Sequence, residues 1–162
     1  MVGQRLTRPI RHTIFLEDYI DVPMHLAAIE QRFLAGGGWL APFANSAEHE
    51  GEALLMRLGP AWGGGRIARE VRVRIRGTRT RGEANVISLT WVDAQRPGLF
   101  PVLDGDLELA PVGDESCRLT LSATYTPPLG DFGADLDRAV LHHVAQSTVR
   151  SFLCQVAKTL ES

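Results

Sequence analysis

Apolar residues recur at helical spacing over the last part of the chain, and this pattern predicts one long helix there. Neither proline nor glycine interrupts residues 134–162. Asp135 and Asp137 fall in the first turn, where carboxylates suit the positive end of a helix. A helix of about seven turns is much longer than the usual ~11–12 residues. Because it needs a broad surface to lie on, we expect it to cross a curved antiparallel sheet.

The predicted helix separates into an apolar side and a polar side. The apolar side carries Leu141, Ala145, Thr148, Val149, Phe152, Leu153, Val156 and Leu160, and the polar side carries His143, Gln146, Arg150, Lys158 and Glu161. His142 falls at the edge of the apolar side, together with Arg138 one turn earlier. Either both bond to the backbone or to a carboxylate such as Asp137, or both are polar contacts in a ligand cavity.

Six segments before the helix have the pattern of strands: 12–20, 52–58, 67–76, 87–92, 100–110 and 117–125. Most of them alternate apolar and polar residues, which is typical of an antiparallel sheet with one face in water. The apolar faces include Trp91, Leu107, Leu121 and Tyr125. Arg69 breaks the alternation on its strand. Either a bulge or the strand end shifts it, or it points inward and would bind an anion, because a buried guanidinium needs a partner.

The connection after the first strand predicts one or two short helices. Asp21 and Pro23 have the residue types of a helix start. The glycines at 36–38 end that helix. Trp39, Leu40 and Phe43 then form either a short second helix or a loop with an apolar underside. This segment would act as a mobile lid, or it would plug the end of the core.

Two further segments complete the predicted order of elements. Residues 44–51 are too polar to be assigned to a strand, and residues 77–83 have the composition of a turn. The order is therefore strand, one or two helices, a run of strands and one long helix. This order predicts an α+β fold in a single domain over residues 1–162.

Composition fits an ordinary soluble domain, with 162 residues, 44% hydrophobic residues and 22% charged residues. The net charge of −2 argues against a nucleic-acid binder. Seven arginines lie between Arg66 and Arg81, but they alternate with core residues and lack interleaved aromatics, so we expect a solvated sheet face balanced by acidic residues. There is neither a bilayer-spanning apolar run nor a signal core. We expect a cytoplasmic protein without membrane insertion.

Motifs for catalysis, metals and cofactors are missing from the sequence. His12, His25 and His49 are scattered, without the spacing of a zinc site, and there is no nucleophile elbow, Walker loop or dinucleotide fingerprint. We expect neither a metal nor a cofactor. Cys117 and Cys154 are expected to be free thiols.

Several segments resemble a known superfamily. Asp21, Val22 and Pro23 lead from the first strand toward a helix, residues 99–109 read LFPVLDGDLEL, and residues 125–130 (YTPPLG) precede 136–143 (LDRAVLHH). The chain resembles uncharacterised bacterial members of the SRPBCC superfamily, the START-related and polyketide-cyclase-like proteins with the helix-grip fold. The resemblance implies a six- or seven-stranded antiparallel sheet that grips the long helix around an apolar cavity. Members bind lipids, sterols, plant hormones or polyketides, and some are cyclases or dehydratases. They share no catalytic residue set that could be transferred.

Three hypotheses for function follow. The first is the binding of a small hydrophobic or amphipathic molecule in a cavity lined by Arg69, Trp91, Leu107, Leu121, Tyr125, Arg138, His142 and Phe152. The second is a cyclase or dehydratase in which His142 is the general acid/base and Arg138 or Tyr125 orients a carbonyl. The third is a protein-interaction module with an apolar patch around Trp39, Phe43 and Trp62. Both a monomer and a homodimer are compatible with the sequence.

Overall fold

The computed structural model describes residues 14–35, 44–48, 53–58, 61–62, 65–66, 69–93, 102–126 and 138–162. Side chains are described for 14–35, 73–91, 102–124, 142–143, 145–147 and 149–162. The strands are β1 (Ile14–Val22), β2 (Ala44–Glu48), β3 (Ala53–Leu58), β4 (Ala61–Trp62), β5 (Gly65–Arg66), β6 (Arg69–Arg81), β7 (Ala84–Asp93), β8 (Val102–Val112) and β9 (Ser116–Thr126). The helices are α1 (Leu26–Leu34) and α3 (Arg138–Glu161).

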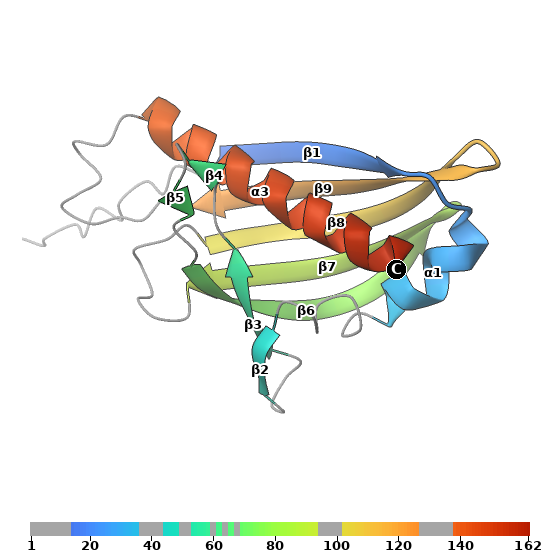
Figure 1. Cartoon of the computed structure of the whole chain (residues 1–162), viewed down its shortest axis with the longest axis horizontal. Helices are drawn as coiled ribbons and strands as arrows, with labels where there is room; N and C mark the ends of the chain where they lie inside the picture. The colour runs from blue at the N-terminus through green and yellow to red at the C-terminus, as the bar shows by residue number, and fades with distance from the viewer. Residues whose placement is uncertain are drawn as a thin grey trace, which may run out of the picture.

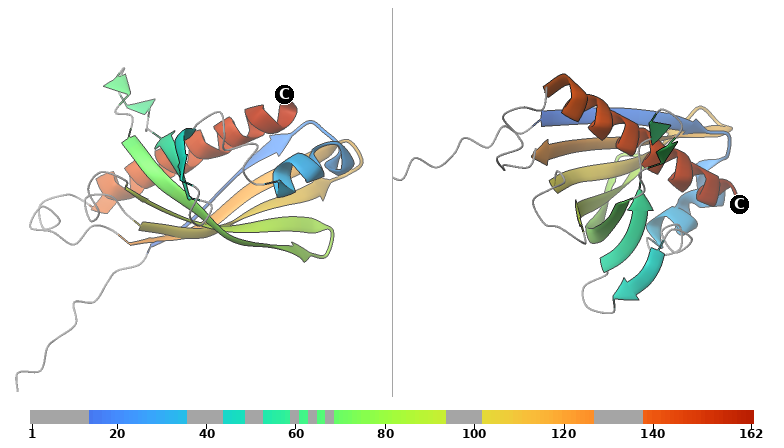
Figure 2. Two further views of the ribbon diagram at one scale, coloured as in Figure 1. Left: turned by 90° about the horizontal axis from the view of Figure 1, so that it is seen from below. Right: turned by 60° about the vertical axis from the view of Figure 1, so that its left-hand side comes forward.

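One curved antiparallel sheet contains seven of these strands in the order β1-β9-β8-β7-β6-β3-β2. The helix α3 crosses its concave side diagonally, from the β1 edge toward α1 (Figure 1). The views in Figure 2 show the sheet bending around the helix. The predicted α+β fold, with a six- to seven-stranded antiparallel sheet around a long C-terminal helix, is confirmed. Among the described strands, the short β4 and β5 pair with each other and are not part of this sheet.

The strand β2 was not expected, because residues 44–51 looked too polar for one. It lies at the edge of the sheet and pairs with β3 alone, in a register that shifts between Ala44 and Ala47. An edge strand has a neighbour on one side only, so it buries less surface and can tolerate a polar sequence. Apolar alternation is therefore a poor guide to such a strand.

The turn predicted at 77–83 is much shorter in the structure. The strand β6 continues to Arg81, and only Gly82 and Glu83 connect it to β7. Gly82 has a φ of 60°, in the left-handed region that glycine adopts at no steric cost. A register shift between Ile75 and Gly77 explains the error. Beyond this bulge, the alternation that marks the first half of β6 no longer continues in phase.

The helix start predicted at Asp21 and Pro23 is also wrong. The strand β1 runs through Val22, and α1 begins only at Leu26. Asp21 does not cap the helix, because its carboxylate accepts hydrogen bonds from Arg118 Nε at 2.7 Å and Nη2 at 3.2 Å. The partner strand β9 thus uses the carboxylate that the sequence pattern assigned to the helix.

The two sides of α3 agree with the prediction wherever side chains are described. Ala145, Val149, Phe152, Leu153, Val156 and Leu160 are buried, and His143, Gln146, Arg150, Lys158 and Glu161 are exposed. Asp135 and Asp137 lie outside the described residues, so their place in the first turn stays a prediction. Neither described helix is long and apolar enough to cross a membrane.

The convex face of the sheet carries paired charges. Arg79 and Arg81 on β6 bind Asp106 and Glu108 on β8, and Arg76 lies 3.7 Å from Asp104. The hydroxyl groups of β7 also bond to these acids: Ser88 donates to Asp106 and Thr90 donates to Asp104. The expectation that acidic residues balance the arginines is confirmed for Arg76, Arg79 and Arg81.

The end of the concave face beside α1 is closed by large side chains and by polar links. Phe33 and Ile29 of α1 are fully buried with Leu160 of α3. Arg32 Nη1 donates to the Leu160 carbonyl at 2.7 Å, which satisfies one of the free carbonyls at the end of α3. Asn85, 2% exposed, donates to Glu30 at 2.9 Å. Both links hold α1 in place, and α1 in turn fixes the last turn of α3.

The two cysteines are free thiols in the structure, as expected. Cys117 is buried on β9, and burial raises the pKa of its thiol. Cys154 is half-buried on α3.

Candidate functional site

A row of residues crosses the sheet at the end where β1 begins. Cross-strand partners follow one another in the order Ile14, Tyr125, Leu103, Trp91 and Val73. Directly opposed residues of an antiparallel sheet lie on the same face. The side chains of Leu103, Trp91 and Val73 are all buried. Leu103, Trp91 and Val73 form an apolar wall at the end of the sheet that lies opposite α1.

An aromatic contact joins the helix to this wall. Trp91 and Phe152 pack edge to face, with ring centroids 5.3 Å apart and an interplanar angle of 72°. This is a favourable geometry for two aromatic rings. Among the strands, the backbone of α3 lies beside β1 over the greatest length, and β1 is one edge of the sheet. The long side chains of Trp91 and Phe152 therefore bridge the wider separation between α3 and β7.

Two neighbouring residues on the concave face have small side chains or none. In the row next to Trp91 and Leu103, Gly105 of β8 is paired with Ala123 of β9. A Cβ atom on Gly105 would lie 2.6 Å from the Ala123 Cβ, and Cβ atoms in proteins do not approach other atoms so closely. Glycine is therefore required here by the close approach of the neighbouring strand.

Four predicted cavity residues lie together in one buried cluster: Trp91, Leu107, Leu121 and Phe152. Leu107 and Leu121 are direct cross-strand partners in the middle of the sheet, and neither is exposed to solvent. In the described part of the chain these residues pack into the core. Whether a ligand also reaches them stays a prediction.

Three predicted site residues are placed by their backbone alone. The register of β6 is uninterrupted from Arg69 to Ile75, so there is no bulge at Arg69, and Arg69 is the first residue of the strand. Tyr125 lies between Ile14 and Leu103, and Arg138 is the first residue of α3. The directions of these side chains stay predictions. Trp39 and Phe43, the proposed lid, lie outside the described residues.

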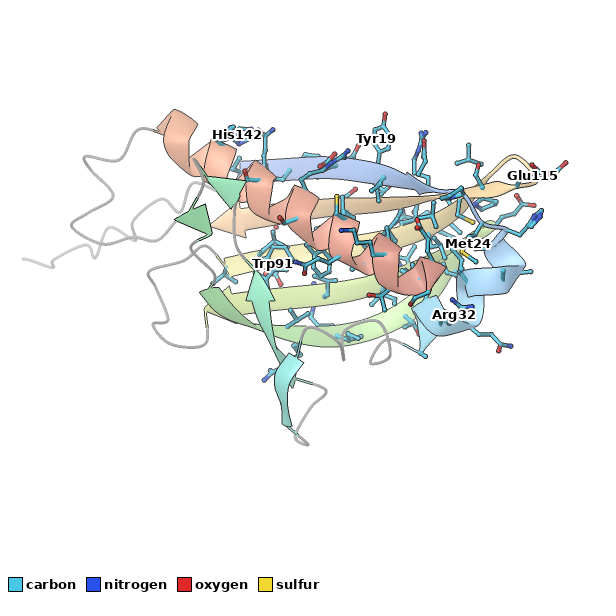
Figure 3. The ribbon with its side chains drawn as sticks, in the orientation of Figure 1. Tyr19, Met24, Arg32, Trp91, Glu115 and His142 are labelled. Carbon is cyan, nitrogen blue, oxygen red and sulfur yellow. The ribbon has the colours of Figure 1, made fainter. Side chains whose placement is uncertain are left out.

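His142 is half-buried on α3, near the start of β1 (Figure 3). The same view shows it well apart from Trp91. Within the described part of the chain, its imidazole makes no hydrogen bond. The structure therefore does not bring the candidate general acid/base together with the aromatic pair, and its catalytic role stays a prediction.

The β1 side of α3 holds a polar cluster that the sequence analysis missed. Arg150 Nη1 donates to Asp18 Oδ1 at 3.1 Å and to the Tyr19 carbonyl at 2.7 Å. The Tyr19 N–H donates to the same Asp18 oxygen at 2.8 Å. Because β1 is an edge strand, the backbone groups of Tyr19 would otherwise need water or another strand. We call Asp18, Tyr19 and Arg150 the edge clamp.

An open groove of about 360 Å³ runs beside the edge clamp. It is lined by Leu16, Glu17, Asp18, His143, Gln146, Ser147, Val149 and Arg150. Glu17 accepts a hydrogen bond from Ser122 at 2.9 Å, and Asp18 is held by Arg150, so both acids already have partners. The groove contains none of the predicted cavity residues.

The other side of α3 contains a buried acceptor. The side-chain oxygen of Gln155, Oε1, is buried and has no hydrogen-bond partner among the described residues. Sequence reasoning did not select Gln155, since whether an amide is paired depends on which side chains surround it after packing. A glutamine three residues after Phe152, on the same side of the helix, is the only signal the sequence offers.

Comparisons with known proteins identify the fold. No family model matches the chain, and no curated protein matches its sequence. Similar solved structures include norcoclaurine synthase from Thalictrum flavum, with a TM-score of 0.62 and 13% identity over 100% of this chain and 97% of that chain. The Zhui aromatase/cyclase from Streptomyces has a TM-score of 0.56 and 17% identity over 93% and 94% of the two chains. A START superfamily protein from Mycobacterium smegmatis has a TM-score of 0.58 and 10% identity over 91% and 97%.

At these identities, the likeness shows the fold and leaves the activity open. The chain has the helix-grip fold of the SRPBCC proteins, as its sequence segments suggested.

Proposed function

We propose that this protein binds a small hydrophobic or amphipathic molecule between the concave face of the sheet and α3. The observation that carries the proposal is the Trp91–Phe152 contact. It bridges α3 and β7 at the apolar wall, while the backbone of α3 lies close to β1. Ligand sites in proteins are lined mainly by apolar and aromatic side chains with a few polar groups. A ligand that enters beside Trp91 would replace apolar packing contacts, and no hydrogen bond of fixed direction would have to be broken.

Similar folds support this proposal. One structure of norcoclaurine synthase, with a TM-score of 0.58 and 13% identity to this chain, is a complex with dopamine and hydroxybenzaldehyde. That fold thus accommodates small aromatic molecules in one protein. The similarity in fold supports a small aromatic ligand for this chain as well.

The alternative proposal is a cyclase or dehydratase that uses His142. It is supported by the similarity to an aromatase/cyclase and by a half-buried imidazole without a partner among the described residues. We rank it second because His142 lies apart from Trp91 (Figure 3). A His142→Ala variant that retains ligand binding but loses turnover would move it to first place. A cytoplasmic location, the interaction-module hypothesis and the choice between monomer and homodimer stay predictions.

The test of ligand binding is native mass spectrometry of the protein purified from its own host, with analysis of any released molecule. We expect a stoichiometric apolar or amphipathic compound. Displacement of 1-anilinonaphthalene-8-sulfonate by small aromatics provides a second readout. A bare mass, together with no saturable probe binding, would contradict the proposal.

Two substitutions on neighbouring residues of β8 locate the site. Leu103→Trp adds a large side chain next to Trp91 and should abolish occupancy. Val102→Trp is the matched control, because Val102 is the adjacent residue but 39% exposed, whereas Leu103 is 2% exposed. If Leu103→Trp melts early, the smaller Leu103→Phe replaces it. Equal loss of binding in both Trp variants would show that the site lies elsewhere.

A further inference from the structure

The buried oxygen of Gln155 is the starting point. Buried polar groups in proteins are nearly always hydrogen-bonded, and an unpaired one destabilises the folded state. Gln155 Oε1 is buried, and no group in the described part of the chain donates a hydrogen bond to it. The hydroxyl of Thr159, one turn further along α3, is already used, since it donates to the backbone carbonyl of Gln155 at 3.1 Å. The side-chain oxygen is thus left with its full capacity to accept.

The position of Gln155 on α3 places it on the side of the aromatic contact. Successive residues of a helix are separated by about 100°. Gln155 therefore lies about 60° from Phe152 and about 140° from Arg150. Phe152 meets Trp91, whereas Arg150 belongs to the edge clamp. The unpaired acceptor and the aromatic pair share one side of the helix, and Arg150 on the opposite side is bonded to β1.

We infer that the ligand carries a hydroxyl or amino group that donates a hydrogen bond to Gln155 Oε1, while its apolar body packs near Phe152 and Trp91. This inference rests on the proposed binding function and specifies the chemical class of the ligand. An amide oxygen accepts hydrogen bonds and cannot donate them. A pure hydrocarbon or an ether would leave Oε1 unpaired, and an alcohol, phenol or amine would satisfy it.

Three probes of similar shape test the inference by displacement of 1-anilinonaphthalene-8-sulfonate. The probe 2-naphthol has a donor, 2-methoxynaphthalene has only an acceptor, and 2-methylnaphthalene has neither. We expect the wild-type protein to bind 2-naphthol about tenfold more tightly than the other two, which corresponds to about 1.4 kcal/mol. In Gln155→Met, which keeps the length of the side chain without its amide, this preference should fall to about twofold or less.

Gln146→Met is the matched control, because it makes the same substitution on the exposed side of the same helix. Its preference for 2-naphthol should equal that of the wild-type protein. The ligand-free proteins provide an independent readout. Gln155→Met should melt at a higher temperature than the wild-type protein, because it removes an unpaired buried acceptor, and Gln146→Met should leave the melting temperature unchanged.

The outcomes separate the inference from the proposed function. If all three probes bind with the same affinity, and Gln155→Met changes none of them, the site exists and the inference is wrong. If 2-methoxynaphthalene binds as tightly as 2-naphthol, the site recognises an acceptor, and the inference is again wrong. If no probe binds, both the proposed function and the inference are contradicted.

Discussion

The two sides of α3 are held to the sheet by different kinds of interaction. On the β1 side, Arg150 makes two directional hydrogen bonds, and Asp18 also accepts the Tyr19 N–H. On the other side, Phe152 packs on Trp91, and Gln155 Oε1 has no hydrogen-bond partner where the structure is described. Directional bonds fix a helix in one place, whereas apolar contacts can adjust to a new neighbour. The comparison suggests that α3 is anchored along β1 and responds to a ligand on its other side.

The largest effect is expected from Phe152→Ala, which removes the helix side of the aromatic contact. Phe152 is fully buried, so its loss should lower the free energy of unfolding by about 3–5 kcal/mol. Urea denaturation measures the change. Phe15→Ala is the matched control, because Phe15 is 61% exposed, and it should cost about 0.5 kcal/mol or less. Similar costs for both variants would show that the contact with Trp91 does not hold this side of α3.

Gly105→Val tests the close approach of β8 and β9 on the concave face of the sheet. The new side chain would collide with Ala123, so we expect a loss of about 1–3 kcal/mol in the free energy of unfolding. Gly77→Val is its control, since a Cβ on Gly77 would meet nothing within 4 Å. Thermal melting of the two variants should therefore diverge. If Gly77→Val is equally damaging, the cost comes from the strand backbone rather than from the contact with Ala123.

Arg150→Ala breaks the edge clamp and sharpens the contrast between the two sides. An exposed ion pair contributes little, and the hydrogen bond to the Tyr19 carbonyl adds to it, so we expect a loss of about 1 kcal/mol. The preference for 2-naphthol should be unchanged, because the clamp lies on the other side of α3. Lys158→Ala, at another exposed cation of the helix, controls for the loss of charge. A changed probe preference in Arg150→Ala would contradict the independence of the two sides.

Asp106→Asn is expected to have the smallest effect. It tests the convex face of the sheet, which is not in contact with α3. Burial raises the pKa of Asp106, but hydrogen bonds from Ser88 and Arg79 and the charges of Arg79 and Arg81 outweigh it, so the pKa lies below 3.8. A carboxyl whose pKa is lower in the folded protein than in the unfolded chain stabilises the fold at any pH above the unfolded-chain pKa. This contribution is lost as the pH falls through the pKa of the folded protein.

The wild-type protein should therefore be slightly more stable than Asp106→Asn at neutral pH, by less than about 1 kcal/mol, since the groups are partly exposed. The difference should shrink as the pH falls below about 4. Urea denaturation at a series of pH values measures it. A difference that grows on acidification would contradict the direction assigned to this pKa.

Residue patterns predicted the fold well because helical and strand periods depend on burial. The exposed and buried sides of α3 and the inward residues of β7 to β9 follow directly from apolar spacing. The limits of β6 and the start of α1 were wrong, since a bulge and a pairing between Asp21 and Arg118 override local signals. Such features depend on which strands meet, and a single sequence does not show this.

Less of the candidate site could be predicted. Trp91 and Phe152 were selected as inward residues, and the structure brings them into contact. The edge clamp joins Asp18 and Arg150, which lie 132 residues apart, so no local pattern reveals it. Whether the side-chain oxygen of Gln155 has a hydrogen-bond partner depends on which residues pack around it. Long-range pairing and the satisfaction of polar groups are therefore what the sequence could not supply.

The pairing of β1 with β9 has a consequence for how the chain is made. The strand β1 is synthesised well before its partner β9, and α3 follows only after β9. The contact between Arg32 and Leu160 spans 128 residues. Folds dominated by such distant contacts assemble slowly, and apolar surface exposed during the delay favours aggregation. During synthesis, the concave face would stay uncovered until α3 docks, and a chaperone that shields Trp91 and Leu107 in that interval should raise the yield of folded protein.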